Sequence, residues 1–386
     1  MVASAGVLLL SGPAMTQDKP IKIGFVSTFT GPTAVIGNDM RKAFDLALDH
    51  MGRKMGGRPV EVIYEDDSQK PDVGKQKTQK LIESDKVDFI AGFIWSNVLL
   101  ASLKPIVDAQ TLFVSANAGP SQYAGELCSQ YAFSTSFQND QTPQAVAEYM
   151  NQKGVKTAYL IGPNYAAGKD TLSGVVSAFK GKVVGEDLTK WPDQLDFSAE
   201  LSKARAAKPD AIFAFYPGAA GVQFLNQYAQ QGLKGQIPLY TVFTIDQLSL
   251  PLQKELALGV AGAQHWVEDL PFDSNKKFVV DFRTKYKTSP SFYAAQSYDA
   301  AQLINSAVVA AKGDVTQKDV MRDEMRKANF PSVRGPFKYG NNHIPIQNFY
   351  LQDVVKNADG SFGLKTVATI VEDSQDRFAS KCPMKW

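Results

Sequence analysis

Short apolar runs alternate with segments of helical periodicity along most of the chain. Residues 21–26 form the first apolar run, and residues 40–51 then carry apolar side chains on one face at helical spacing. A second apolar run follows at residues 60–64, so this stretch predicts a strand–helix–strand unit. Further strands are expected at residues 86–93, 111–116, 157–162, 183–187, 211–216, 238–243 and 260–266, with helices between them. This alternation is typical of α/β proteins whose parallel sheets are covered by helices on both faces.

The strand–helix units fall into two series, separated by the polar run at residues 138–142. A chain of 386 residues is too long for one hydrophobic core but suits two lobes. After the second series, three more helices are expected at residues 275–286, 293–311 and 317–327, followed by two strands at 347–355 and 363–370. Asp359-Gly360 lies between these strands, and Asp-Gly favours a hairpin there.

Charge and hydropathy exclude several classes of protein. Charged residues make up 21% of the chain and the net charge is +2. This balance argues against a nucleic-acid partner, which usually needs a concentrated basic surface, and against a disordered chain. Residues 1–20 contain a short apolar run at 7–10 and small residues at 12–17, so we interpret them as the remnant of a secretory signal peptide. No segment of the sequence has the roughly 20 apolar residues that span a membrane, so we expect no direct membrane span.

Motifs for catalysis are missing from the sequence. Gly162 to Lys169 resembles a phosphate loop, but five residues separate its glycines and Asp170 stands where Ser or Thr would hold magnesium. The first strand is not followed by G-x-G-x-x-G, and neither H-E-x-x-H nor G-x-S-x-G occurs. The three histidines are far apart, and two cysteines are too few for a cysteine-rich metal site. We therefore expect a binding protein rather than an enzyme, with no cofactor and no metal.

The opening unit gives a more specific indication. Its strand runs into the loop Thr30-Gly31-Pro32, a helix follows, and the second strand ends in Glu65-Asp66-Asp67. This order resembles the start of the leucine/isoleucine/valine-binding family of periplasmic solute-binding proteins, and the resemblance covers nearly the whole chain from Ile21.

The resemblance implies a fold and a function. It implies two Rossmann-like lobes with parallel sheets, joined by three crossing segments near residues 138–141, 267–270 and 338–343. It also implies that the protein is a periplasmic monomer that captures a small solute between its lobes and delivers it to the membrane subunits of an ABC importer. The lobes would comprise residues 21–138 plus 268–338, and residues 139–267 plus 339–386.

Candidate ligand residues lie where strands end, because open α/β sheets bind ligands beyond the carboxyl ends of their strands. In the resembling family, loop residues of the first lobe hold a ligand carboxylate and a tyrosine of the second lobe closes over the ligand. The matching residues here are Ser96, Asn97, Asn117, Ala118, Gly119 and Tyr165. A helix start with a hydroxyl suits a carboxylate, although Ser96 could instead serve only as a helix cap.

Aromatic residues also gather at the predicted strand ends, namely Phe29, Trp95, Tyr165, Tyr216 and Phe243. They would provide a flat apolar wall with polar tips. Amino-acid binders of the family pair the ligand ammonium with an acidic residue, and counting places Ile245 at that position, while Asp246 could cap the next helix. We therefore favour an aromatic acid such as benzoate or a hydroxybenzoate. The alternatives are a branched-chain amino acid, or a ligand-sensing regulatory domain of the same fold.

The two cysteines are Cys128 and Cys382. An exported chain folds in an oxidising compartment, where two cysteines can pair, so we predict a disulfide between them. The alternative is two unrelated free thiols.

Overall fold

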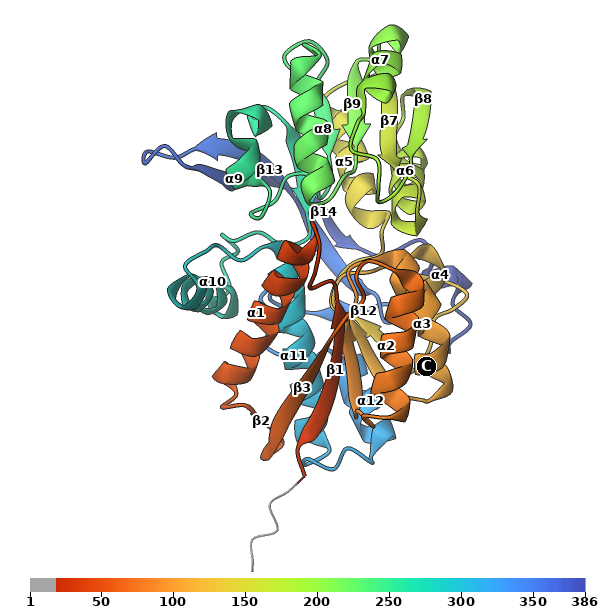
Figure 1. Ribbon diagram of the computed structural model, residues 1–386, viewed down its shortest axis with the longest axis vertical. Helices are drawn as coiled ribbons and strands as arrows, with labels where there is room; N and C mark the ends of the chain where they lie inside the picture. The colour runs from red at the N-terminus through yellow and green to blue at the C-terminus, as the bar shows by residue number, and fades with distance from the viewer. Residues whose placement is uncertain (1–18, 386) are drawn as a thin grey trace, which may run out of the picture.

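The computed structural model describes residues 19–385, so the predicted signal-peptide remnant lies almost entirely outside the described residues. Two α/β lobes lie one above the other, and a long hairpin passes between them (Figure 1). The α/β fold class and the two series of strand–helix units are thereby confirmed.

The first lobe is built on a six-stranded sheet that is parallel except for its edge strand β2. Its strands, in spatial order, are β2 (Lys54–Met55), β3 (Arg58–Asp66), β1 (Ile21–Ser27), β4 (Phe89–Gly92), β5 (Leu112–Ser115) and β6 (Ala132–Ser134). The central strands are buried along their whole length, which is why they read as apolar runs without alternation. The helices of this lobe are α1 (Ala34–His50), α2 (Pro71–Glu83), α3 (Ser96–Asp108), α4 (Ser121–Ala124), α11 (Phe292–Ala310) and α12 (Lys318–Lys327).

The second lobe is built on an eight-stranded sheet. Its strands, in spatial order, are β12 (Lys338–Tyr339), β13 (Pro345–Lys356), β11 (Ala261–Gln264), β10 (Leu239–Thr241), β9 (Ala211–Ala214), β7 (Thr157–Pro163) and β8 (Lys182–Thr189), with β14 (Phe362–Ser374) paired to β13. Its helices are α5 (Gln141–Gln152), α6 (Ala166–Ala178), α7 (Ser198–Ala207), α8 (Ala219–Gln230) and α9 (Leu250–Gln253). Helix α10 (Asp273–Tyr286) follows β11 in the chain but contacts α1 of the first lobe (Figure 1).

Most predicted elements after residue 267 agree with the structure within two or three residues, and the predicted hairpin is present as β13 and β14. The helix expected between the strands at residues 238–243 and 260–266 is different. It is only the four-residue helix α9 followed by a 3-10 turn at Lys254–Ala257. Lys254 has a positive φ of 47°, which an α-helix cannot accommodate, so the helical pattern is interrupted there.

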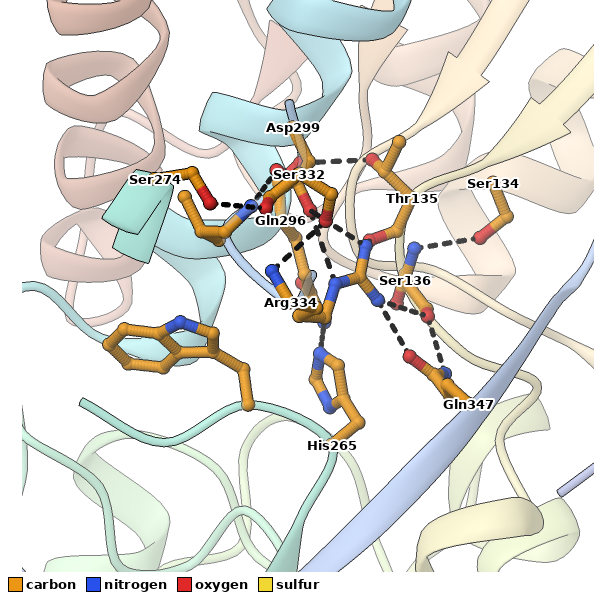
Figure 2. A network of polar contacts seen from close by, with 12 residues as sticks. Ser134, Thr135, Ser136, His265, Ser274, Gln296, Asp299, Ser332, Arg334 and Gln347 are labelled. Carbon is orange, nitrogen blue, oxygen red and sulfur yellow. Dashed lines mark hydrogen bonds and ion pairs between the residues drawn. The ribbon is translucent and has the colours of Figure 1, made fainter. Parts of the chain in front are cut away.

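Three segments carry the chain between the lobes, and a buried arginine connects them (Figure 2). Arg334 donates to the backbone oxygen of Thr135 at 2.6 Å in the first crossing, and to Gln347 Oε1 at 2.7 Å at the start of β13. Its guanidinium also pairs with Asp299 of α11 at 3.1 Å. Both charged side chains are almost fully buried, so the ion pair is screened little by water.

The second crossing joins the same region through His265, which follows β11. Gln296 Nε2 of α11 lies 2.8 Å from His265 Nε2. An amide nitrogen can only donate, so His265 accepts at Nε2 and carries its proton on Nδ1. Burial holds the pKa of His265 well below its usual range, and the nearby positive charge of Arg334 lowers it further. The three crossings therefore meet around one face of α11.

The carboxyl-terminal tail returns to the first lobe after β14 (Figure 1). Cys128 and Cys382 form a disulfide, with 5.7 Å between their Cα atoms. Asn342 Nδ2 donates to Asp376 Oδ2 at 2.8 Å and to the backbone oxygen of Ala124 at 2.7 Å. The division drawn from the sequence put all of residues 339–386 in the second lobe, whereas the segment around Asp376 to Cys382 lies against the first.

His343, beside β6, should make stability depend on pH. Its ring stacks on Phe133 at 4.0 Å between centroids, and its Nδ1 donates to the backbone oxygen of Ala132 at 2.9 Å. Burial lowers its pKa to about 3, and Arg326 lowers it as well. Below pH 6.5 the unfolded chain therefore binds a proton that the folded chain does not, and stability falls as the pH falls towards 3.

The expected slope is about 1.4 kcal/mol per pH unit for one such group. Urea unfolding at pH 6.5 and pH 5 of the native protein and of His343→Gln measures it. Between these pH values the native protein should lose about 2 kcal/mol more than the variant. Equal losses would show that His343 is not held neutral.

Candidate functional site

A small cavity lies between the lobes, where the carboxyl ends of both sheets face each other. Its volume of about 20 Å³ has room for about one water molecule. It is lined by Ile94, Trp95, Ser96, Asn117, Phe137, Asn139, Tyr165, Ala167, Thr171, Phe215, Pro217, Phe243 and Tyr293. These residues come from both lobes and from the first crossing, so the lobes are closed over the cavity.

Two helices begin at this cavity. In the first lobe α3 begins at Ser96, and in the second lobe α6 begins at Ala166. Within residues 19–385 the backbone N–H groups of Ser96 and Asn97, at the start of α3, make no hydrogen bond. Free N–H groups and the positive ends of two helix dipoles make this region favourable for an anion.

Ser96 is not the cap of its helix. The residue in the cap position is Trp95, and no side chain caps α3. Ser96 Oγ instead accepts a hydrogen bond from Asn139 Nδ2 at 3.0 Å. The alternative that Ser96 serves only as a helix cap is therefore excluded, and its hydroxyl lies on the cavity wall.

Further polar groups face the cavity without a partner. Asn117 Nδ2 donates to the backbone oxygen of Ile94 at 2.8 Å, while its Oδ1 is buried and unpaired within the described part of the chain. Burial raises the pKa of the Tyr165 and Tyr293 phenols, so both hydroxyls stay neutral and can donate. A carboxylate ligand would find donors in the two phenols, whereas the unpaired Oδ1 of Asn117 can only accept.

Aromatic rings form most of the remaining wall. Tyr165 stacks on Trp191 at 5.2 Å between centroids, and Trp191 lies 5.4 Å from Trp95. On the other side Phe243 stacks on Phe137 at 4.8 Å. Rings in offset or edge contact favour each other, and they would favour a further ring placed among them.

The structure brings five of the predicted ligand residues to this cavity, namely Trp95, Ser96, Asn117, Tyr165 and Phe243. The other predicted residues do not line it. Phe29 packs edge-on against Tyr64 at 5.8 Å, and Asn97, Ala118 and Gly119 are not among the lining residues. A Cβ atom on Gly119 would lie 1.9 Å from the backbone oxygen of Phe137, so this glycine permits close packing of the first crossing.

Tyr216 was predicted at the site but lies on the opposite face of its sheet. Its hydroxyl is 2.8 Å from Thr189 Oγ1, and its ring packs against Phe197 at 4.5 Å. Side chains alternate along a strand, so the neighbouring Phe215 faces the cavity in its place. The alternation within residues 211–216 could have given this assignment.

Asp246 is also outside the cavity. Its Oδ1 accepts from the backbone nitrogens of Leu248 at 2.9 Å and Ser249 at 2.7 Å, which starts the turn into α9. Burial raises the pKa of this carboxyl, and its Oδ2 has no partner among residues 19–385. Ile245, at the position counted from the family, is apolar and packs into the core of the second lobe. Asp246 thus stabilises the turn that leads into α9, while the cap position of that helix is held by Ser249.

The sequence reasoning missed Asn139, Trp191, Phe215 and Tyr293, which contribute to the site. Trp191 comes two residues after the end of β8, a strand end that the sequence reasoning did not consider. Tyr293 lies in α11 and does not follow a strand. Within residues 19–385, no three His, Cys, Asp or Glu side chains gather as a metal site requires. No helix in that range is long and apolar enough to cross a membrane.

Comparison with known proteins agrees with this architecture. The family model described as periplasmic binding protein matches residues 20–360. A Leu/Ile/Val-binding protein homolog 6 from Brucella melitensis is 29% identical over 380 residues, covering 95% of this chain and 96% of that protein. A crystal structure of an ABC-transporter solute-binding protein from R. palustris in complex with benzoate has a TM-score of 0.89 and 31% identity, covering 95% of this chain and all of that one.

A second solved structure is similar to this chain. It is a solute-binding protein of an ABC transporter from Rhodopseudomonas palustris BisB5 in complex with 3,4-dihydroxybenzoic acid. Its TM-score is 0.84 and its identity 29%, with 93% of this chain and 99% of that chain covered. The family match extends over most of the chain and agrees with the two-lobed fold, so this protein belongs to the periplasmic binding protein family.

Proposed function

We propose that this protein is the solute-binding component of an ABC importer and that it captures an aromatic carboxylate, such as benzoate or a hydroxybenzoate, between its lobes. The observation that carries the proposal is the cavity wall itself. Aromatic rings from both lobes surround a region where two helices begin, and among residues 19–385 no acidic side chain lines it. A ring with one negative charge matches both features.

The cavity of about 20 Å³ is much smaller than an aromatic acid, so the ligand enters when the lobes open. Closure then brings Trp95 and Ser96 of the first lobe and Tyr165 of the second lobe onto the ligand. A ligand that contacts both lobes stabilises the closed state by its differential affinity for that state.

Two similar solved proteins also favour this class of ligand, because they are complexes with benzoate and with 3,4-dihydroxybenzoic acid. The second candidate is a branched-chain amino acid, favoured by the name of the Brucella relative. An ammonium group enclosed in this cavity would need a carboxylate partner, and without one its burial would cost several kcal/mol.

The cellular setting belongs to the same proposal. We place the protein in the periplasm, exported through a signal peptide, where it acts as a monomer that delivers its ligand to the membrane subunits. The first lobe then comprises residues 21–138, 268–338 and the tail from Asp376, and the second lobe comprises residues 139–267 and 339–375. The protein holds its ligand and does not transform it.

The Ser96 hydroxyl gives the first test. Ser96→Ala should weaken benzoate binding by about 1–3 kcal/mol, the usual loss when a hydrogen bond to a charged group is removed. Titration calorimetry measures the change. Ser306→Ala is the matched control, because Ser306 lies on α11 away from the cavity and its hydroxyl only donates to the backbone oxygen of Leu303. Equal benzoate affinities for all three proteins would remove Ser96 from the site.

A further inference from the structure

Asp170 of α6 connects the two lobes without lining the ligand cavity. Its carboxylate accepts from the backbone nitrogen of Ser121 at 2.9 Å and from the Ser121 hydroxyl at 2.8 Å. Ser121 begins α4 of the first lobe, whereas α6 belongs to the second. The same carboxylate accepts a third hydrogen bond, from Asn139 Nδ2 at 3.0 Å.

Asn139 lies in the first crossing and is almost fully buried. Its Nδ2 also donates to Ser96 Oγ at 3.0 Å, so the NH₂ group donates to two oxygens, one of Asp170 and one of Ser96. An ionised carboxylate can only accept hydrogen bonds. The amide end that faces Asp170 must therefore be the NH₂, and the same NH₂ faces Ser96.

This arrangement determines what the Ser96 hydroxyl can do. One lone pair of Oγ accepts from Asn139, and within residues 19–385 the hydroxyl donates to no other group. Its hydrogen is thus available at the cavity wall, beside the first N–H groups of α3. A ligand atom that meets it must be an acceptor.

We propose that Asp170 is a positioning residue that acts through Asn139 to fix the Ser96 hydroxyl as a donor, and so selects ligands that present a carboxylate. This role rests on the proposed function, because it concerns how the same cavity selects its ligand. Asp170 does not line the cavity. It therefore influences which ligand binds only by fixing the orientation of the Asn139 amide.

Asp170→Leu removes the carboxylate while keeping a side chain of similar size. Oδ2 of Asp170 accepts from both the Ser121 nitrogen and Asn139 Nδ2, so an asparagine at this position keeps its oxygen there and leaves Asn139 unchanged. Leucine offers no acceptor, so Asn139 is no longer held with its NH₂ towards Ser96. Its amide can then turn its oxygen to Ser96, the Ser96 hydroxyl donates to that oxygen, and the ligand loses a donor.

The measurement is the affinity for benzoate relative to benzamide, which has nearly the same shape but brings hydrogens of its own. In the native protein benzoate should bind more tightly, and Asp170→Leu should reduce the benzoate-to-benzamide preference at least tenfold. A folded Asp170→Leu variant whose preference stays within twofold of the native value would overturn the inference. Asp376→Leu is the matched control, because Asp376 is a buried carboxylate that accepts from Asn342 and is remote from Ser96 in the hydrogen-bond network. An equal shift in this control would also overturn the inference.

Failure of the proposed ligand class can be recognised separately. If the native protein binds leucine rather than aromatic acids, the same ratio is measured with leucine and leucinamide, and the expected change is the same. If none of these compounds binds, the proposed function fails, and a neutron structure of the native protein tests the inference alone. Deuterium on Ser96 Oγ pointing into the cavity supports it, and deuterium pointing at Asn139 contradicts it.

Discussion

Arg334→Met should lower the free energy of unfolding by about 3–5 kcal/mol, the usual cost of removing one partner of a buried ion pair. The variant leaves Asp299 charged and unpaired, with its side chain fully buried. It also leaves the backbone oxygen of Thr135 and Gln347 Oε1 without the guanidinium that now satisfies them. Urea unfolding at neutral pH measures the change.

A double variant separates the charge from the remaining contacts. Arg334→Met with Asp299→Asn removes the uncompensated charge, so it should be more stable than Arg334→Met alone. Arg334→Lys keeps a positive charge but cannot reach the same set of acceptors, and it should fall between the native protein and Arg334→Met. A loss below 1 kcal/mol in Arg334→Met would contradict the role of this residue as the connection between the crossings.

Loss of the disulfide should have an effect of similar size. Cys128 and Cys382 are 254 residues apart in sequence, so their bond restricts a very long loop in the unfolded chain. The chain-entropy model gives a stabilisation of up to about 5 kcal/mol for loops of this order. The double variant Cys128→Ser, Cys382→Ser should therefore unfold at a much lower urea concentration than the oxidised native protein.

Reduction provides the matched control for that comparison. Native protein in a reducing buffer should approach the stability of the double variant, and the double variant should not respond to the reductant. Thiol titration of denatured, unreduced protein checks the bond itself. Two reactive thiols per chain would show that the disulfide does not form.

The sequence predicted the architecture well because its strands are buried on both faces. Runs such as residues 21–26 and 111–116 had to be central strands, and their order along the chain gave two α/β series. The predicted family and fold class are confirmed. The tail beyond Asp376 could not be placed in this way, because its position depends on a disulfide and on side-chain hydrogen bonds to the first lobe.

The candidate site was only partly predictable. Residues directly after strands could be found by position, and Trp95, Ser96 and Tyr165 do line the cavity. Phe215 and Tyr216 show that the alternation of side chains along a strand must also be considered. Phe215 faces the cavity, whereas Tyr216 faces the core of the second lobe. Tyr293 comes from α11, more than a hundred residues away from the other lining residues of its lobe, and only tertiary packing brings it to the cavity.

Titration calorimetry of the disulfide-intact protein with benzoate, 4-hydroxybenzoate and leucine tests the central claim most directly. The aromatic wall, and the absence of a carboxylate among its lining residues in the described range 19–385, predict two results. At least one of the two aromatic acids should bind at a single site, and leucine should give no binding heat. Tight binding of leucine with no response to either aromatic acid would contradict the proposal that the cavity takes an aromatic carboxylate.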